Sequence, residues 1–217
     1  MPVPDLSPLW VSLKVSLLAT VITLHFGTLV AYRMYRYRGK GRSLIDGILI
    51  TPLILPPTVI GFVLLILLGK NGVLGQILPQ GNLRIVFTWY AAVLAAIVVS
   101  FPLMYRSALG AFEQIDSLIL DAARIDGASE RAVFWYVSLP LASPGIIAGT
   151  VLTFARALGE FGATLMIAGN IPGQTQTIPM AIYFAVEAGA TQEGWFWAMI
   201  AILISLAGIV TVNSCKI

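Results

Sequence analysis

Two oppositely charged side chains, Arg156 and Glu160, stand in an apolar stretch and are the residues best placed to do chemistry. Ionisable side chains within such a stretch are costly to bury and are functional candidates. Their spacing puts them on one face of a helix, where they can pair. Three roles fit: a structural ion pair between packed helices, an arginine lining the path of an anion, or a glutamate that ties two copies of the chain together. In the second role, Glu160 would weaken the hold of Arg156 on the anion.

The elements that position this pair are predicted to be membrane-spanning helices. Of the 217 residues, 58% are hydrophobic and 11% charged, whereas a soluble domain carries about 25% charged residues. Crossing about 30 Å of hydrocarbon takes about 20 helical residues. About five segments meet this length, and we expect one all-α, polytopic domain over residues 1–217, embedded in lipid; the segments are Leu9–Tyr32, Ile48–Leu68, Ile85–Tyr105, Gly145–Gly169 and Trp195–Val212.

Prolines and small residues predict local departures from straight helices. Pro52, Pro56 and Pro57 are expected to bend the second span, either as a packing kink or as part of a pathway. The apolar run Ile178–Ala188 has too few residues to span and predicts a re-entrant or interfacial helix on the outer side. Small residues recur in the fourth span, where they favour close helix packing; these are Gly145, Gly149 and Gly159.

The distribution of basic residues predicts the orientation in the membrane. Cytoplasmic flanks of spanning helices carry an excess of lysine and arginine. An outer N-terminus and an inner C-terminus leave only Lys70 and Arg84 outside, and they place the following residues inside: Arg33, Arg36, Arg38, Lys40, Arg42, Arg106, Arg124, Arg131 and Lys216. Because this charge flanks membrane helices, no nucleic-acid partner is expected.

The composition argues against resident catalytic chemistry. One cysteine, Cys215, and one histidine provide neither a disulfide nor a metal cluster, and no H-E-x-x-H motif occurs. The sequence also lacks the G-x-x-x-x-G-K-[ST] phosphate-binding loop. We therefore expect no catalytic residue, no metal and no cofactor on this chain. A membrane-embedded enzyme and a passive channel are weaker alternatives.

The segment between the third and fourth spans, about 106–140, has a different pattern. Apolar and small residues from Leu118 to Ala123 predict a short helix, Gly127 permits a tight turn, and Ser129 is suited to cap a second helix. Two short helices meeting at Gly127 would form a compact knob. Small residues at its tip would let the backbone of another protein approach closely.

The spacing within this segment resembles a signature of permease subunits of binding-protein-dependent ABC importers. That signature runs Glu-Ala-Ala, Gly, then Ile-x-Leu-Pro, and here aspartate replaces its glutamate and valine its isoleucine. The resemblance implies a type I importer permease whose knob, the coupling helix, docks on a cytosolic ATPase. The docking residues would be Asp121, Ala122, Ala123, Gly127, Ala128, Val137, Leu139 and Pro140.

The same resemblance implies the partners and the location. A second copy of the permease, two ATPase subunits that bind ATP and Mg, and an external substrate-binding protein would complete an importer in a prokaryotic inner membrane. Three segments, Leu55–Leu65, Ala155–Gly173 and Thr175–Tyr183, look like the molybdate branch of the family. The expected cargo is a small oxyanion, molybdate or tungstate. Sulfate and thiosulfate permeases share a similar Arg-Ala-Leu-Gly-Glu segment and remain the alternative.

Overall fold

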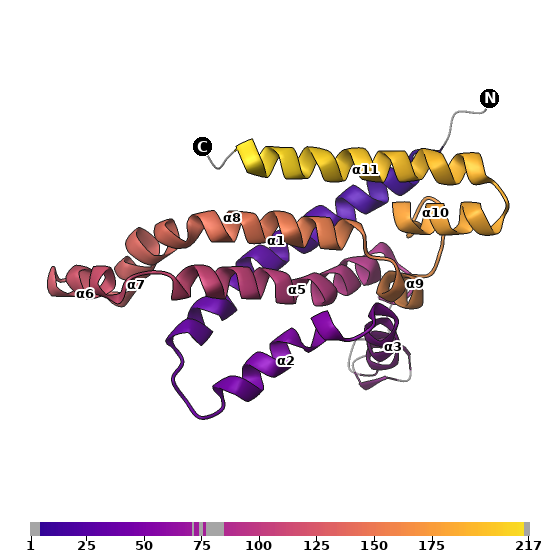
Figure 1. Ribbon diagram of the computed structural model, residues 1–217. Coiled ribbons are helices and arrows are strands. Elements are labelled where there is room, and N and C mark those ends of the chain that lie inside the picture. Colours follow the sequence, from indigo (N-terminus) through magenta and orange to yellow (C-terminus); the bar gives the residue numbers. More distant parts are fainter. Residues whose placement is uncertain (1–4, 71, 74–75, 77–84, 215–217) are drawn as a thin grey trace.

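Long helices lying side by side form the body of the molecule (Figure 1). The computed structural model describes residues 5–70, 72–73, 76 and 85–214, and in these ranges its regular elements are all helices. Short helices lie at both ends of the bundle, α6 and α7 at one end and α9 and α10 at the other (Figure 1). The long helices are α1 (Ser7–Arg36), α5 (Trp89–Glu113), α8 (Leu139–Leu158) and α11 (Thr191–Ser214).

The core lies where α1, α5 and α8 meet. Ala91, Ala92, Ala95 and Ala96 of α5 are completely buried, and their small side chains let neighbouring helices approach closely. On α1 the buried hydroxyls of Ser16, Thr20 and Thr23 bond within the helix; Thr20 Oγ1, for example, donates to the carbonyl of Ser16 at 2.6 Å. Such internal bonds satisfy polar groups without water, as a membrane-spanning helix requires.

The predicted spans agree with the observed helices at both ends of the chain. α1 contains the first predicted span and α11 the last. α1, α5 and the continuous helical stretch Glu130–Leu158 are each long and apolar enough to cross a membrane, and α2 with α3 can make a bent fourth span. The predicted third span, Ile85–Tyr105, is displaced, because α5 begins at Trp89 and continues as far as Glu113. The first part of the predicted loop 106–140 therefore belongs to α5.

The second predicted span, Ile48–Leu68, is not one helix. It is divided into α2 (Arg42–Ile54) and α3 (Pro57–Leu68), whose axes differ by 109°. Pro56 and Pro57 carry no backbone N–H to continue the helical ladder, and each disfavours helical backbone in the residue before it. The bend expected from the prolines is confirmed, and it is large enough to fold α3 back against α9.

The fourth predicted span, Gly145–Gly169, is also wrong at both ends. The helix begins with α7 at Glu130 and runs through a π-helical turn, Phe134–Ser138, into α8. Pro144 cannot donate to the carbonyl of Pro140, and Ser143 Oγ donates to that carbonyl instead at 2.7 Å. The helix therefore continues through Pro144. It ends at Leu158, and a separate short helix, α9 (Gly162–Ala168), follows.

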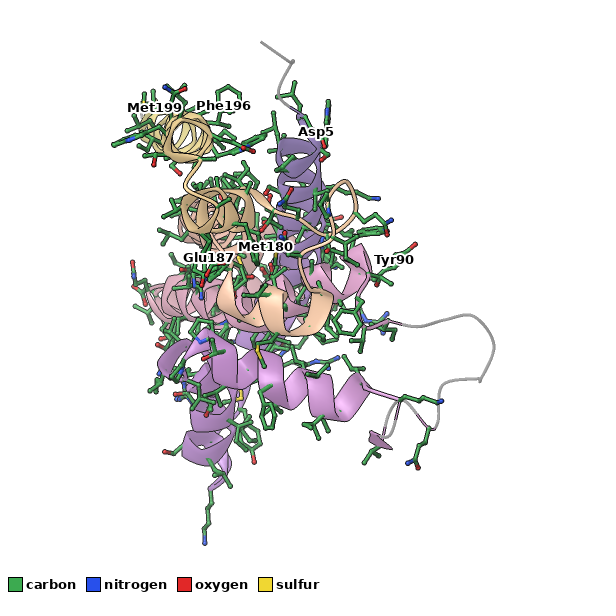
Figure 2. The ribbon with its side chains drawn as sticks, turned by 90° about the vertical axis from the view of Figure 1, so that its right-hand side faces the viewer. Asp5, Tyr90, Met180, Glu187, Phe196 and Met199 are labelled. Atoms are coloured by element: carbon green, nitrogen blue, oxygen red, sulfur yellow. The ribbon has the colours of Figure 1, made fainter. Side chains whose placement is uncertain are left out.

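The short helix predicted at Ile178–Ala188 is present as α10 (Ile178–Glu187). The backbone N–H of Ile178 donates to Ser12 Oγ of α1 at 2.8 Å, which fixes the start of α10 to the bundle. At its other end, α10 stops two residues before Gly189, which has a φ of +74°. α10 packs beside the start of α11, where Trp197 is buried. Figure 2 views the molecule from this end, with Asp5, Tyr90 and Glu187 labelled.

Candidate functional site

The knob consists of α6 (Ser117–Ile125) and α7 (Glu130–Val133), joined by a turn at Gly127. Gly127 has a φ of +88°, a backbone conformation that glycine adopts without strain. Its N–H donates to the carbonyl of Arg124, and the N–H of Ala128 donates to that of Ala123, both at 3.0 Å. These two bonds make a Schellman motif, which ends α6 sharply. The turn predicted at Gly127 is thus present, and Ser129 Oγ accepts from the N–H of Ala132 at the start of α7.

One face of α6 is exposed and largely apolar. We call it the docking stripe: Leu118, Asp121, Ala122 and Ile125. Leu118 is 72% exposed and Ile125 is 85% exposed, while Leu120 on the opposite face is buried against the bundle. Spacings of three and four residues keep the four stripe residues on one side of the helix. An exposed apolar stripe on a rigid, projecting helix is suited to contact another protein.

The other predicted docking residues have different places in the fold. Ala123 and Ala128 contribute to the bonds that end α6. Val137 belongs to the π-helical turn, and Leu139 and Pro140 begin α8. The spacing that resembles the importer signature therefore covers the stripe, the turn beneath it and the start of the helix that carries the knob.

A network of charges attaches the knob to α1. Arg124 donates to Asp121 at 2.7 Å and to Glu130 at 2.9 Å, and these hydrogen bonds raise the pKa of Arg124 above its ordinary value. The second carboxylate oxygen of Glu130 lies 3.0 Å from Nη1 of Arg36, near the end of α1. The rings of Tyr32 and Phe134 pack beside this network with centroids 4.4 Å apart. This role of Glu130 could not be predicted from the sequence, because its two arginine partners come from separate segments.

Glu130 is expected to transmit movement rather than to add stability. Its ion pair with Arg36 is half exposed, and such pairs contribute about 0–1 kcal/mol. If the chain works as the importer permeases that the spacing of its knob resembles, replacing Glu130 by glutamine should lower transport about threefold to fivefold while ATPase binding and the melting temperature stay near wild type. Transport and ATP hydrolysis measured on the same reconstituted complex would test this. Arg42→Gln, which breaks the 2.7 Å pair between α2 and the end of α5 and leaves the contacts of Glu130 in place, is the control; an equal loss there would contradict the prediction.

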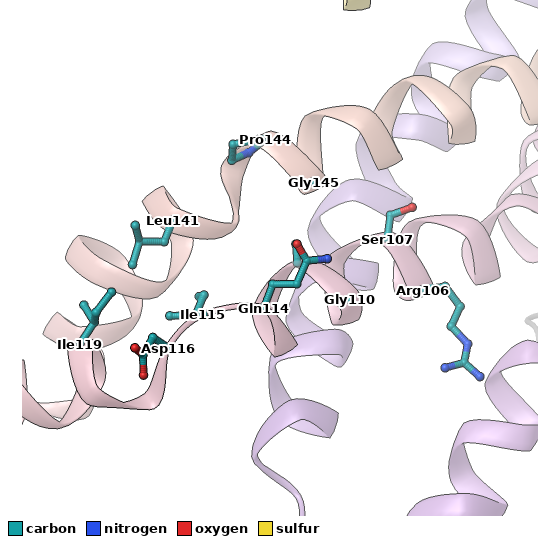
Figure 3. A pocket seen from close by; sticks show the side chains of 11 residues that line it. Arg106, Ser107, Gly110, Gln114, Ile115, Asp116, Ile119, Leu141, Pro144 and Gly145 are labelled. Carbon is teal, nitrogen blue, oxygen red and sulfur yellow. The ribbon is translucent and has the colours of Figure 1, made fainter. Parts of the chain in front are cut away.

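An open groove of about 620 Å³ lies beside the knob, between α5, α6 and the start of α8 (Figure 3). Its polar lining includes Arg106, Ser107 and Gln114. Arg106 is held by Asp46 of α2 at 2.9 Å, and the Tyr105 hydroxyl donates to the same carboxylate at 2.7 Å. The groove could not be predicted from the sequence, since it forms only where three helices meet.

The glycines predicted to allow close packing have two different environments. A Cβ on Gly145 would lie 2.6 Å from Cβ of Ala111, and one on Gly149 would lie 2.5 Å from Cβ of Ser107, so both glycines face α5 across a tight seam. Gly159 is at the C-cap of α8, where an added Cβ would meet only the carbonyl of Ala155 within the described chain. Its predicted packing role is not found, because the helix ends there.

Arg156 and Glu160 pair as their spacing predicts, with Nη1 and Oε2 2.8 Å apart. The N–H directions do not align with Oε2, so that oxygen has an ion pair but no hydrogen bond within the described chain. The other oxygen, Oε1, accepts from the N–H of Ala163 at 2.8 Å and thereby joins the end of α8 to α9. Glu160 is only 2% exposed. Glu160 is thus enclosed by its own chain, which favours a role within one copy over the predicted role of tying two copies together.

Three segments that suggested the cargo meet around this pair. Gly61 of α3 lies against Ala163 of α9, where an added Cβ would be 2.7 Å from Cα of Ala163. The rings of Phe161 and Tyr183 have centroids 5.1 Å apart. The Thr175 hydroxyl donates to the carbonyl of Gly169 at 2.9 Å. The proline bend, the α8–α9 break and the loop before α10 thus form one end of the bundle.

Known proteins match both the sequence and the fold. The model of the family described as "Binding-protein-dependent transport system inner membrane component" matches residues 24–214. The molybdenum transport system permease protein ModB of Escherichia coli K12 is 45% identical over 192 residues, covering 88% of this chain and 84% of that protein. ModB of Haemophilus influenzae is 42% identical over 204 residues, covering 93% and 89%. The sulfate permease CysW of Synechococcus elongatus is 34% identical over 203 residues, covering 92% and 71%.

Solved structures agree in fold at low sequence identity. A bacterial ABC transporter that imports the polysaccharide alginate matches with a TM-score of 0.75 at 19% identity, over 96% of this chain and 79% of that chain. The methionine ABC transporter MetNI, in an inward-facing form, matches with a TM-score of 0.72 at 18% identity, over 95% and 94%. The chain therefore belongs to the family of binding-protein-dependent transport system inner membrane components.

Proposed function

We propose that this chain is the permease subunit of an ATP-driven importer of molybdate. The observation that carries the proposal is the docking stripe, held on a charge-anchored knob in a chain that is 42–45% identical to ModB proteins. Identity to the sulfate permease CysW is lower, at 34%, which favours molybdate over sulfate.

The knob end is the cytoplasmic end in this proposal. Most of the basic residues lie near the knob, as they do in cytoplasmic flanks. They occur at the end of α1, at the start of α2, in the half of α5 nearer the knob and in the knob itself. α1 begins at the end away from the knob and α11 runs back toward the knob end (Figure 1). An outer N-terminus and an inner C-terminus follow. A substrate-binding protein then delivers the anion at the end where α9 and α10 lie.

The mechanism is a transfer of movement from an ATPase to the bundle. Two copies of this chain enclose a pathway, and two ATPase subunits, which bind ATP and Mg, contact the two docking stripes. When ATP draws the ATPases together, each knob moves as a unit, because Arg124 and Glu130 brace its two helices. Glu130 passes the movement to α1 through Arg36, and the π-helical turn passes it to α8.

Molybdate uptake by the complete importer tests the proposed function. The permease would be produced with its ATPase and binding protein in cells that lack molybdate uptake, and cellular molybdenum would be measured by mass spectrometry. We expect ATP-dependent uptake that excess tungstate suppresses and excess sulfate does not. Uptake of sulfate without molybdate would assign the chain to the other branch. Uptake that persists without the ATPase would contradict the importer mechanism itself.

A further inference from the structure

We propose that Arg156 is a weak binding station for a tetrahedral oxyanion on the transport path, with Glu160 as its fixed counter-charge. The proposal rests on the proposed function and specifies where the anion is contacted inside the permease. Three observations support it. Glu160 is held in place whereas Arg156 is not, the pair lies along the seam between α5 and α8, and the negative charge of Glu160 offsets the positive charge of Arg156.

The carboxylate is the fixed member of the pair. Glu160 is 2% exposed, and the N–H of Ala163 holds Oε1 at 2.8 Å. Phe161, the next residue, packs on Tyr183 of α10. A carboxylate bonded to the first turn of α9 and enclosed by its neighbours cannot follow a moving guanidinium.

The guanidinium is the free member. The Arg156 side chain is 29% exposed, and its contact with Oε2 of Glu160 is a 2.8 Å ion pair without hydrogen-bond alignment. Guanidinium carries five N–H donors in a planar fork that matches two oxygens of a tetrahedral oxyanion. In the described part of the chain, none of those donors makes a hydrogen bond to another residue. Arg156 can therefore offer a pair of donors to an anion and remain beside Glu160.

The position of Arg156 connects the outer end with the inner groove. Arg156 follows Gly149 by two helical turns, so the two share the side of α8 that faces α5. Gly145, which lines the groove beside the knob, is on the same seam about 16 Å away at helical rise. The proline bend and α9 lie at the other end. The station thus stands between the end that receives the anion and the groove nearest the ATPase.

The charges explain why such a station releases its anion. A lone buried arginine would hold a dianion tightly, because water that could replace the contact is scarce there. Glu160 repels the same anion from a fixed distance and neutralises Arg156 when the station is empty. The pair therefore attracts an oxyanion less strongly than Arg156 alone. A pathway needs weak sites that an ion can both enter and leave.

Four variants of the complete importer, reconstituted in liposomes, test the station, with molybdate as the probe. Glu160→Gln keeps an oxygen for the Ala163 N–H but removes the charge. We expect about tenfold tighter molybdate retention and about tenfold slower uptake. Arg156→Gln should retain no molybdate and lose uptake, whereas Arg156→Lys should keep part of both. Wild-type uptake in the same assay reports the proposed function separately.

The double variant Arg156→Gln/Glu160→Gln distinguishes a station from a structural ion pair. Removing both charges together leaves no unpaired buried charge, and such neutral replacements are often well tolerated. We expect it to assemble with the ATPase and to transport no molybdate. Wild-type uptake by this variant would overturn the proposal, as would its failure to assemble, since that result would assign the pair to folding. Unchanged retention in Glu160→Gln would also overturn it.

Discussion

Replacing Gly127 by valine is expected to abolish binding of the ATPase, while asparagine at the same position should preserve much of it. Gly127 has a φ of +88°, and a Cβ there would meet nothing within 4 Å. The substitution therefore acts through the backbone alone. L-residues in this region cost roughly 1–2 kcal/mol, a β-branched side chain is a strong outlier there, and asparagine is tolerated best. Loss of the turn would remove the two bonds that end α6 and would misplace the docking stripe.

Co-purification of the ATPase with the tagged permease measures this effect. Gly173 provides a matched control, because it has a φ of +74°, has equally open surroundings and lies far from the knob in the loop before α10. Gly173→Val should impose similar backbone strain and leave ATPase binding intact. Wild-type recovery of the ATPase with Gly127→Val would show that the turn is not required for docking.

Features encoded within a few consecutive residues could be predicted from the sequence. The Schellman turn at Gly127, the cap at Ser129 and the short helix α10 each depend on local chemistry, and the structure contains all three. The extent of α1 follows in the same way from one long apolar run between polar flanks.

Features that depend on distant partners could not be predicted. The fourth span was expected to begin at Gly145, but the helix begins earlier and continues through Pro144, because Ser143 Oγ donates to the Pro140 carbonyl that Pro144 leaves free. The bond from Ala163 to Glu160 turns an expected mid-span residue into a link between two helices. The α2–α5 pairs and the Arg36–Glu130 contact join segments that are far apart in the chain. Hydrophobic periodicity and residue spacing do not predict contacts between residues that are far apart in the chain.

The candidate site combines both kinds of information. The four-residue spacing of Arg156 and Glu160 predicted that they would pair, and they do. Spacing alone could not choose among the roles. Burial of Glu160 inside its own chain favours a role within one copy. That Arg156 lies on the side of α8 that faces α5 follows from the packing of Gly149 on Ser107, which only the fold provides.

Replacing Ile125 by aspartate is also expected to reduce ATPase binding below the limit of detection. Ile125 is 85% exposed at the end of the docking stripe, and burying an isoleucine side chain in a partner contributes about 1.5–3 kcal/mol. Ile125→Ala should therefore weaken binding by roughly 10-fold to 100-fold. Aspartate would add the cost of placing an unpaired charge in the interface.

Ser117→Asp is the control for Ile125→Asp. It distinguishes disruption of the docking stripe from a general effect of added negative charge on α6. Ser117 is exposed in the first turn of the same helix and off the docking stripe, where a carboxylate is favoured by the helix dipole. Ser117→Asp should therefore bind the ATPase as wild type does. If Ile125→Asp still retains the ATPase at wild-type affinity, the partner does not contact this face of α6, and the anchored knob must act through a different surface.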